Sequence, residues 1–310
     1  MCVNSPFCSP SGSDTYLFLR NDDSAIAAKY RQRIETWYKG YASLLDKQFR
    51  DEFCKQPERR YWELVVADTI ETKTDLKLDW TRKQLKQAPT PDIITSYGNH
   101  CVWVEATTTG HGIPGNPNSV PSLPDPDSPD EDSDDDDGES RLSGSDRREL
   151  GLRIQNSFVE KARKLCALNA SGFNIVAIGG GTISSAQWHN NILNWRDVAS
   201  FFYPFSPQHL INLDGSPVSS IRELELEKIG TTETVMKAFA SRQLPHEHVA
   251  GVLFSTHGIA GLSSLMKPAV WWVENPYCPN SLLLRPAFAG INRIIVHAER
   301  RKIEYLPPIT

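Results

Sequence analysis

The segment from Pro91 to Glu105 constrains the fold of this chain more than any other part of it. Its two halves are rich in Ile, Val, Thr, Tyr and Trp, which favour strands, and Gly98-Asn99 between them is typical of a two-residue hairpin turn. If these two residues form the turn, cross-strand partners have numbers that sum to 197, so Asp92 lies opposite Glu105. The sequence therefore predicts a hairpin with two carboxylates on the same side of a sheet.

The predicted pair of Asp92 and Glu105 needs a compensating partner, because like charges directly opposite each other destabilise a sheet. Two carboxylates that converge on one point are typical of a divalent-metal site, and oxygen ligands of this kind suit Mg²⁺ or Mn²⁺. A structural alternative is that Asp92 only anchors the turn after Pro91. We expect the metal site, with Asp92 and Glu105 as its protein ligands.

Length and composition are those of a globular protein with a substantial core. The chain has 310 residues, of which 39% are hydrophobic, enough for one large domain or two smaller ones. No stretch approaches the roughly 20 apolar residues of a membrane span, and the first residues lack the basic and apolar regions of a signal peptide. The six cysteines show no CxxC pairing, which indicates reduced thiols. We expect a cytoplasmic protein, nuclear if the source is eukaryotic, with no membrane partner.

Charge is distributed unevenly along the chain. The formal net charge is −5, yet residues 125–139 contain ten acids and no base, so the rest of the chain carries +5. This mildly basic remainder permits a polyanionic partner. The acidic run belongs to a Pro/Gly/Ser/Asp-rich segment, about 110–146, with too few apolar residues to order itself. We interpret it as a solvated, disordered insertion; the alternatives are an autoinhibitory mimic of nucleic acid and a surface that recruits a basic protein partner.

Hydrophobic periodicity divides the chain into three regions: a lead-in and helix over 1–57, a central region over 58–182 that contains the hairpin and the insertion, and a mixed region over 183–310. The lead-in, 1–22, has no expected helix. The expected helices span about 24–53, 58–70 and 147–168, and the expected strands outside the hairpin span 173–179, 250–255, 269–273 and 292–297. This order predicts an α/β fold in which the last region packs on the central one as an α+β extension.

The order helix, hairpin, helix, strand over residues 58–180 resembles the core of the PD-(D/E)xK nuclease superfamily, which has a restriction-endonuclease-like fold. The matching elements are Glu63 on the first helix, Pro91-Asp92, Glu105, the helix around 153–164 and the strand at 174–178. The wording Val-Trp-Val-Glu-Ala-Thr at 102–107, and the later Val-Glu-Asn-Pro-Tyr, look like those of uncharacterised bacterial members. The resemblance implies a central mixed sheet flanked by helices, and metal-dependent nuclease activity.

One departure from the family pattern concerns the catalytic lysine. The family places Lys two residues after the strand acid, where this chain has Thr107. A lysine there stabilises the charge that develops on the phosphate, so its absence puts catalysis in question unless another cation replaces it. Lys161 is the candidate, three residues after Phe158 on the inward stripe of its helix, and the resemblance implies that some members carry the lysine on this helix. The alternative is a lysine at the edge of the stripe whose ammonium reaches water.

The expected reaction is hydrolysis of a phosphodiester bond in nucleic acid, in the first instance DNA, assisted by Mg²⁺ or Mn²⁺. Asp92, Glu105 and Lys161 form the predicted catalytic set together with Glu63, which would position a water or a second ion and whose assignment comes from the resemblance. Gln155 is a candidate phosphate contact. The basic groups expected to bind the polyanion are Arg147, Arg148, Arg153, Arg163 and Lys164.

Two other classes of function fit the same residues. One is a catalytically lapsed nuclease fold, inactive because of Thr107, that serves as a nucleic-acid or protein interaction module. The other is a structural module whose acidic insertion recruits a basic partner. Metal-dependent cleavage separates the nuclease from both, and deletion of residues 115–142 separates the last two.

Overall fold

The computed structural model describes most of the chain outside the acidic insertion. The described residues are 5–46, 48–80, 90–112, 116, 119, 145–168, 173–183, 194–204, 209–211, 217–220, 225–228, 234–240, 242, 245–257, 259, 269–297 and 302–309. The predicted disordered insertion, about 110–146, lies almost wholly outside these ranges.

The described chain begins with helices, and after α4 strands and helices are mixed. The helices are α1 (Asp14–Asn21), α2 (Ala25–Tyr41), α3 (Phe49–Phe53), α4 (Pro57–Lys73), α5 (Ser145–Leu168), α7 (Trp195–Phe202) and α8 (Ser281–Leu284), with short 3₁₀ helices η2 (His246–His248) and η3 (Arg285–Phe288). The strands are β1 (Lys77–Leu78), β2 (Ile93–Tyr97), β3 (His100–Thr108), β4 (Asn174–Gly179), β5 (His209–Ile211), β6 (Pro217–Ser220), β7 (Glu225–Glu227), β8 (Thr234–Met236), β9 (Val249–Phe254), β10 (Trp271–Glu274), β11 (Asn292–His297) and β12 (Lys302–Leu306).

One mixed sheet of eight strands organises the molecule, in the order β1-β2-β3-β4-β9-β10-β11-β12. The β3–β4 and β4–β9 pairs are parallel, and α5 and α7 lie in the connections between them. The two remaining small sheets, β5-β6 and β7-β8, are separate antiparallel pairs. The expected α/β class with a central mixed sheet is therefore confirmed.

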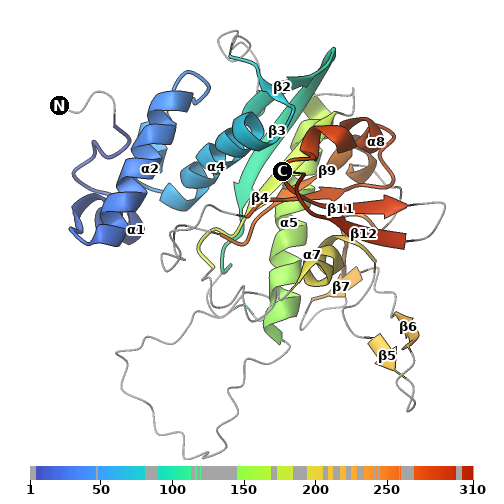
Figure 1. The fold of residues 1–310 in the computed structure, drawn as a ribbon. Coiled ribbons are helices and arrows are strands. Elements are labelled where there is room, and N and C mark those ends of the chain that lie inside the picture. Colours follow the sequence, from blue (N-terminus) through green and yellow to red (C-terminus); the bar gives the residue numbers. More distant parts are fainter. Residues whose placement is uncertain are drawn as a thin grey trace, which may run out of the picture.

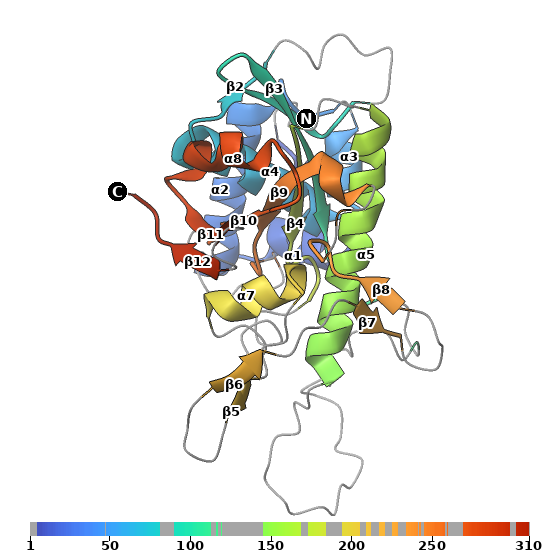
Figure 2. The same cartoon turned by 90° about the vertical axis from the view of Figure 1, so that its right-hand side faces the viewer.

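Helices cover both faces of the sheet (Figure 1). Side chains of α1 to α4, α8 and η3 share one apolar core with Val102, Val104 and Ala106 of β3. The opposite core joins α5 and α7 to Val176 and Ile178 of β4, and Figure 2 shows α5 running alongside these strands. Because successive side chains of a strand point to opposite faces, the odd-numbered residues of β3 face α5.

The first two helices begin at hydroxyl caps, and α2 ends earlier than the periodicity predicts. Ser13 caps α1 and Ser24 caps α2, each accepting a hydrogen bond from a backbone N–H in the first turn. The expectation of an unstructured lead-in over 1–22 is wrong, since α1 lies within it. The single helix expected over 24–53 is also wrong: the Asp46 side chain accepts the Gln48 N–H in a turn that separates α2 from α3.

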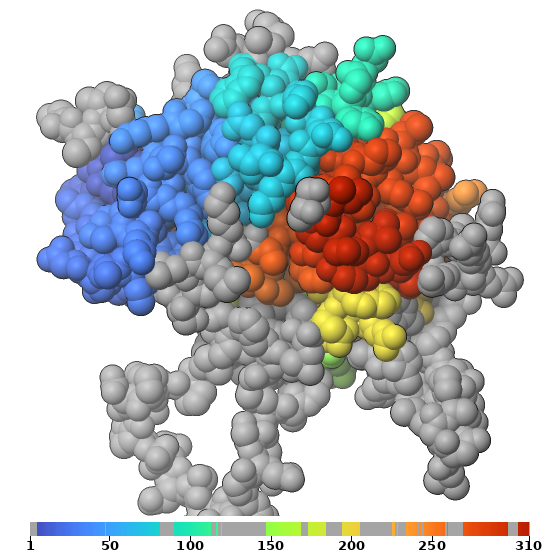
Figure 3. All heavy atoms as spheres, in the orientation of Figure 1, coloured from blue at the N-terminus to red at the C-terminus, as the bar shows by residue number. Residues whose placement is uncertain are grey.

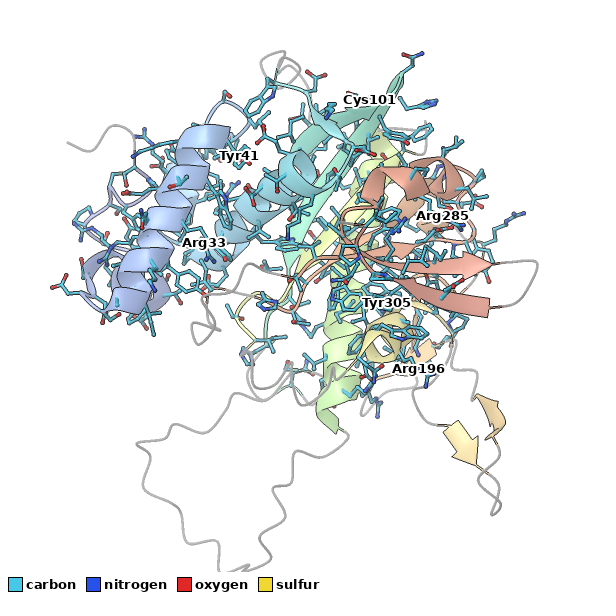
Figure 4. All side chains as sticks on the ribbon, viewed as in Figure 1. Arg33, Tyr41, Cys101, Arg196, Arg285 and Tyr305 are labelled. Atoms are coloured by element: carbon cyan, nitrogen blue, oxygen red, sulfur yellow. The ribbon has the colours of Figure 1, made fainter. Side chains whose placement is uncertain are left out.

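The C-terminal region supplies β9 to β12 of the main sheet, in addition to the separate pairs β5-β6 and β7-β8. Arg285 of η3, labelled in Figure 4, binds both oxygens of the buried Glu274 on β10 at 2.8 and 2.7 Å. Its Nη2 also donates to the Val296 carbonyl of β11, so the guanidinium joins η3 to two strands. In Figure 3 the α4 surface (cyan) lies between the N-terminal helices (blue) and this region (red).

Two further expectations concern the cysteines and the membrane. The five cysteines among the described residues form no disulfide. None of the helices that the structure describes is long and apolar enough to cross a lipid bilayer.

Candidate active site

The predicted hairpin register is confirmed. β2 and β3 pair antiparallel from Ile93↔Val104 to Tyr97↔His100, around a two-residue turn at Gly98-Asn99. Gly98 has a φ of 55°, the left-handed conformation that such turns require. Asp92, the residue immediately before β2, therefore lies beside Glu105 of β3.

The Asp92 side chain is held by a hydrogen bond from β3. The same register would place Pro91 opposite Ala106, but proline has no N–H to donate to the Ala106 carbonyl. The Ala106 N–H, which a regular ladder would direct to the carbonyl of residue 91, donates to Asp92 Oδ2 at 2.9 Å. The side chain of Asp92 thus replaces a main-chain acceptor, and the Ala106 carbonyl receives no ladder hydrogen bond from residue 91.

Glu105 is a carboxylate buried between the sheet and α5. Its neighbours Val104 and Ala106 face the α4 side, so Glu105 faces α5, and its exposed fraction is 0%. Burial first, and then the charge of Asp92, raise the pKa of Glu105 to about 7, while two lysines of α5 oppose the shift. At neutral pH this carboxyl is therefore poised between its neutral and charged forms.

The two lysines of α5 supply the countercharge. Lys164 Nζ lies 2.5 Å from Glu105 Oε1, and Lys161 Nζ lies 3.9 Å from Oε2. Lys161 also lies 3.5 Å from the exposed Glu160. The structure therefore brings Lys161 to Glu105, as predicted for the inward face of this helix.

Lys164 is the site residue that the sequence interpretation does not single out. The sequence suggests only a place in the general polyanion-binding set, yet its ammonium is closer to Glu105 than that of Lys161. Helical spacing could have identified Lys164. Residues three apart in a helix share a face, so the face of α5 that turns Lys161 toward the sheet also bears Lys164.

The donor set fits a divalent ion with oxygen ligands. Both oxygens of Glu105 are buried, and the cations that face them from α5 are the ammonium groups of Lys164 and Lys161. Asp92 and the Ala106 carbonyl complete a set of protein oxygens of the kind that Mg²⁺ binds, with waters in its remaining positions. Among the described residues, no group of three or more His, Cys, Asp or Glu side chains is placed to hold a metal ion, so a richer metal centre has no support there.

The structure does not bring Glu63 to this site. Glu63 lies on α4, on the other side of the sheet from the face that carries Glu105, and it is buried. Arg60 Nη1 donates to both of its oxygens, at 3.0 and 2.7 Å, and Asp46 and Glu52 also bind Arg60. These contacts give Glu63 a structural partner and join α4 to the α2–α3 turn.

Gln155, a predicted phosphate contact, forms its hydrogen bonds within the protein. Gln155 is fully buried: it donates to the Phe201 carbonyl at 2.5 Å and accepts a hydrogen bond from the Ala238 N–H at 2.7 Å, so the predicted phosphate contact is wrong.

The predicted basic residues differ in their surroundings. Arg147 pairs with Asp197 at 3.0 Å, and Arg153 donates to the Gly110 carbonyl. Arg163 is exposed. Thr107 shares the α5-facing side of β3 with Glu105 and is half-buried.

Figure 4 labels Cys101, which lies on the same strand as Glu105. It lies on β3 toward the hairpin turn, four residues before Glu105, and its sulfur accepts a hydrogen bond from Trp103 Nε1 at 3.0 Å. The site is therefore set back from the turn, beside the start of β2, which Asp92 immediately precedes.

Comparison of the chain with protein-family models, with curated proteins and with solved structures finds no match. The resemblance to the PD-(D/E)xK superfamily therefore stays a prediction from the sequence, and function has to be inferred from the site itself.

Proposed function

We propose that this protein is a metal-dependent phosphodiesterase of the PD-(D/E)xK type that acts on nucleic acid, in the first instance DNA. The observation that carries the proposal is the opposition of Asp92 and the buried Glu105, with two ammonium groups of α5 at the same carboxylate. A buried acid beside a half-buried one, with adjacent cations, is costly for stability, which favours a functional reason for its presence.

Each residue has a distinct part in this reaction. Asp92 and Glu105 would hold one Mg²⁺ or Mn²⁺, with the Ala106 carbonyl as a third protein oxygen. The chemistry that such an ion supplies is activation of a water and polarisation of a phosphate oxygen. Lys161 and Lys164 place positive charge where the phosphate gains negative charge. The main-chain bond to Ala106 keeps Asp92 oriented while substrate binds.

The helix lysines account for Thr107 in the proposed mechanism. Thr107 occupies the strand position where the family carries its lysine, and it shares a face with Glu105. An ammonium that comes from α5 reaches the same carboxylate from across that face. The cation requirement is thus met from the helix instead of the strand.

Calorimetric titration of MnCl₂ into the wild type, Asp92→Asn and Glu160→Gln tests the proposal, with plasmid cleavage assayed on the same samples. Glu160 is an exposed acid of α5 close to Lys161, so its variant controls for loss of a nearby negative charge. We expect Mn²⁺ binding and cleavage in the wild type and in Glu160→Gln, and loss of both in Asp92→Asn. No Mn²⁺ binding to the wild type at millimolar concentration would contradict the proposal, unless a cation of the protein itself occupies the site.

A second candidate, a non-catalytic interaction module on the same fold, is favoured by two observations. Thr107 replaces the strand lysine, and Glu63 is bound by Arg60 away from the two acids. This candidate predicts DNA binding, measured by gel shift, without cleavage in any divalent ion. A role for the acidic insertion in recruiting a basic protein would appear as loss of that partner when residues 115–142 are deleted, with any cleavage unchanged or raised.

A further inference from the structure

Lys164 and Lys161 hold the Glu105 carboxylate in different ways. Lys164 Nζ is 2.5 Å from Oε1 and its side chain is 37% exposed, whereas Lys161 Nζ is 3.9 Å from Oε2 and its side chain is 9% exposed. One ammonium is therefore in direct contact and open to water, and the other is more distant and enclosed.

We propose that Lys164 is the resident cation of the metal site, and that a divalent ion binds by displacing its ammonium from Glu105. The inference rests on the proposed function, because it concerns the same two carboxylates. It adds a specificity-determining residue to them.

Charge repulsion at Glu105 Oε1, the oxygen that Lys164 contacts, favours the displacement. Mg²⁺ binds carboxylate oxygens at about 2.0–2.1 Å, closer than the ammonium of Lys164 now lies to Oε1. Two cations cannot approach one oxygen from the same side without strong repulsion. Lys164 can withdraw, since its stem is flexible and reaches solvent, while Lys161 has little exposed surface through which to leave.

The displaced ammonium sets which ions can bind. A tethered cation is present at high effective concentration, so a free ion must gain more from Asp92 and Glu105 than the ammonium does. A doubly charged ion has about twice the Coulomb attraction of a singly charged one, and a singly charged ion has no such advantage. Lys164 therefore excludes Na⁺ and K⁺ and admits divalent ions, at some cost in their affinity.

The test is calorimetric titration of MnCl₂, at pH 8 and constant ionic strength, into the full-length wild type, Lys164→Met, Lys161→Met and Asp92→Asn. We expect Lys164→Met to bind Mn²⁺ about tenfold more tightly than the wild type, while Lys161→Met changes the affinity less than about threefold. Each titration is repeated with NaCl replaced by tetramethylammonium chloride, whose cation is too large for the site. Sodium should weaken Mn²⁺ binding to Lys164→Met and leave the wild type unaffected.

The outcomes separate this inference from the proposed function. If the wild type binds Mn²⁺ and Asp92→Asn does not, but Lys164→Met is no tighter or Lys161→Met tightens equally, the displacement is overturned and the metal site stands. Binding to Lys164→Met alone supports the displacement. Absence of binding in both the wild type and Lys164→Met overturns both proposals. Lys164→Gln replaces Lys164→Met if circular dichroism shows that the latter is unfolded.

Discussion

Asp92 and Ala106 are linked by a hydrogen bond in which a side chain takes the place of the neighbouring strand's backbone: the Ala106 N–H donates to Asp92 Oδ2 at 2.9 Å. Pro91, which would lie opposite Ala106, cannot donate in return. The Asp92 side chain thus satisfies a backbone N–H of β3, and the same bond orients a candidate metal ligand. The local structure and the proposed chemistry therefore both depend on the Asp92 carboxylate.

Asparagine and alanine at position 92 should separate these two roles. We expect Asp92→Asn to retain the free energy of unfolding within about 1 kcal/mol, because an amide oxygen still accepts the Ala106 N–H. Asp92→Ala leaves that donor without its acceptor and should cost about 1–3 kcal/mol. Urea unfolding measures both, and equal losses would show that the hydrogen bond contributes little. Mn²⁺ binding should be lost in both variants.

Glu105 should make stability fall as pH rises through the neutral range. A carboxyl whose folded-state pKa, about 7, lies above its ordinary 4.5 binds its proton more tightly when folded. Its stabilising contribution is therefore present below about pH 4.5 and is lost as the pH approaches and passes 7. We expect the wild type to lose up to about 3 kcal/mol relative to Glu105→Gln between pH 5 and pH 8, measured by urea unfolding in EDTA. A constant difference between the two proteins would contradict the raised pKa.

Gln155 should be a strong determinant of stability in spite of its polar side chain. Its amide links α5 to the Phe201 carbonyl and the Ala238 N–H, and it is fully buried. Gln155→Leu leaves both groups without partners, at about 1–3 kcal/mol each. The exposed neighbour Asn156 provides the control, since Asn156→Leu on the same helix should change stability by less than about 0.5 kcal/mol. Similar effects of the two substitutions would contradict the role given to Gln155.

The hairpin turn gives a prediction about backbone conformation. Gly98 has a φ of 55°, so Gly98→Ala places a Cβ in the left-handed region and should destabilise by about 1–2 kcal/mol. Gly40 lies in α2, where an added Cβ meets nothing within 4 Å. Gly40→Ala should therefore be neutral or stabilising by up to about 1 kcal/mol. Thermal unfolding of both variants checks the opposite signs.

Local rules explain which parts of the fold the sequence predicts. The β2–β3 register follows from two turn residues and a period of two, so the opposition of Asp92 and Glu105 is predictable from sequence alone. Helical periodicity predicts one helix over 24–53, whereas α2 ends at Tyr41. Nothing in the apolar pattern shows that the Asp46 side chain binds the Gln48 N–H in a turn. Apolar periodicity also overlooks α1, although Ser13 provides its cap and the first turn carries a favourable acid.

Tertiary contacts explain what the sequence could not predict at the site. Helical periodicity turns both Lys161 and Lys164 toward the sheet, but only the packing of α5 decides which ammonium lies at 2.5 Å from Glu105. The burial of Gln155 could not be predicted, because its hydrogen-bond partners lie 46 and 83 residues away in the sequence and no local pattern indicates them. The Arg60 network that binds Glu63 likewise joins three separate helices and turns.

The place of β4 in the middle of the sheet has a practical consequence for anyone wishing to isolate the candidate active site. β4 pairs with β3 on one side and with β9 on the other, and every residue of the strand is buried. A fragment that stops near residue 183 would contain every site residue, yet it would present a bare apolar strand edge able to template intermolecular pairing. Such a fragment should precipitate on expression, and the smallest soluble unit must include the strands that come last in the chain.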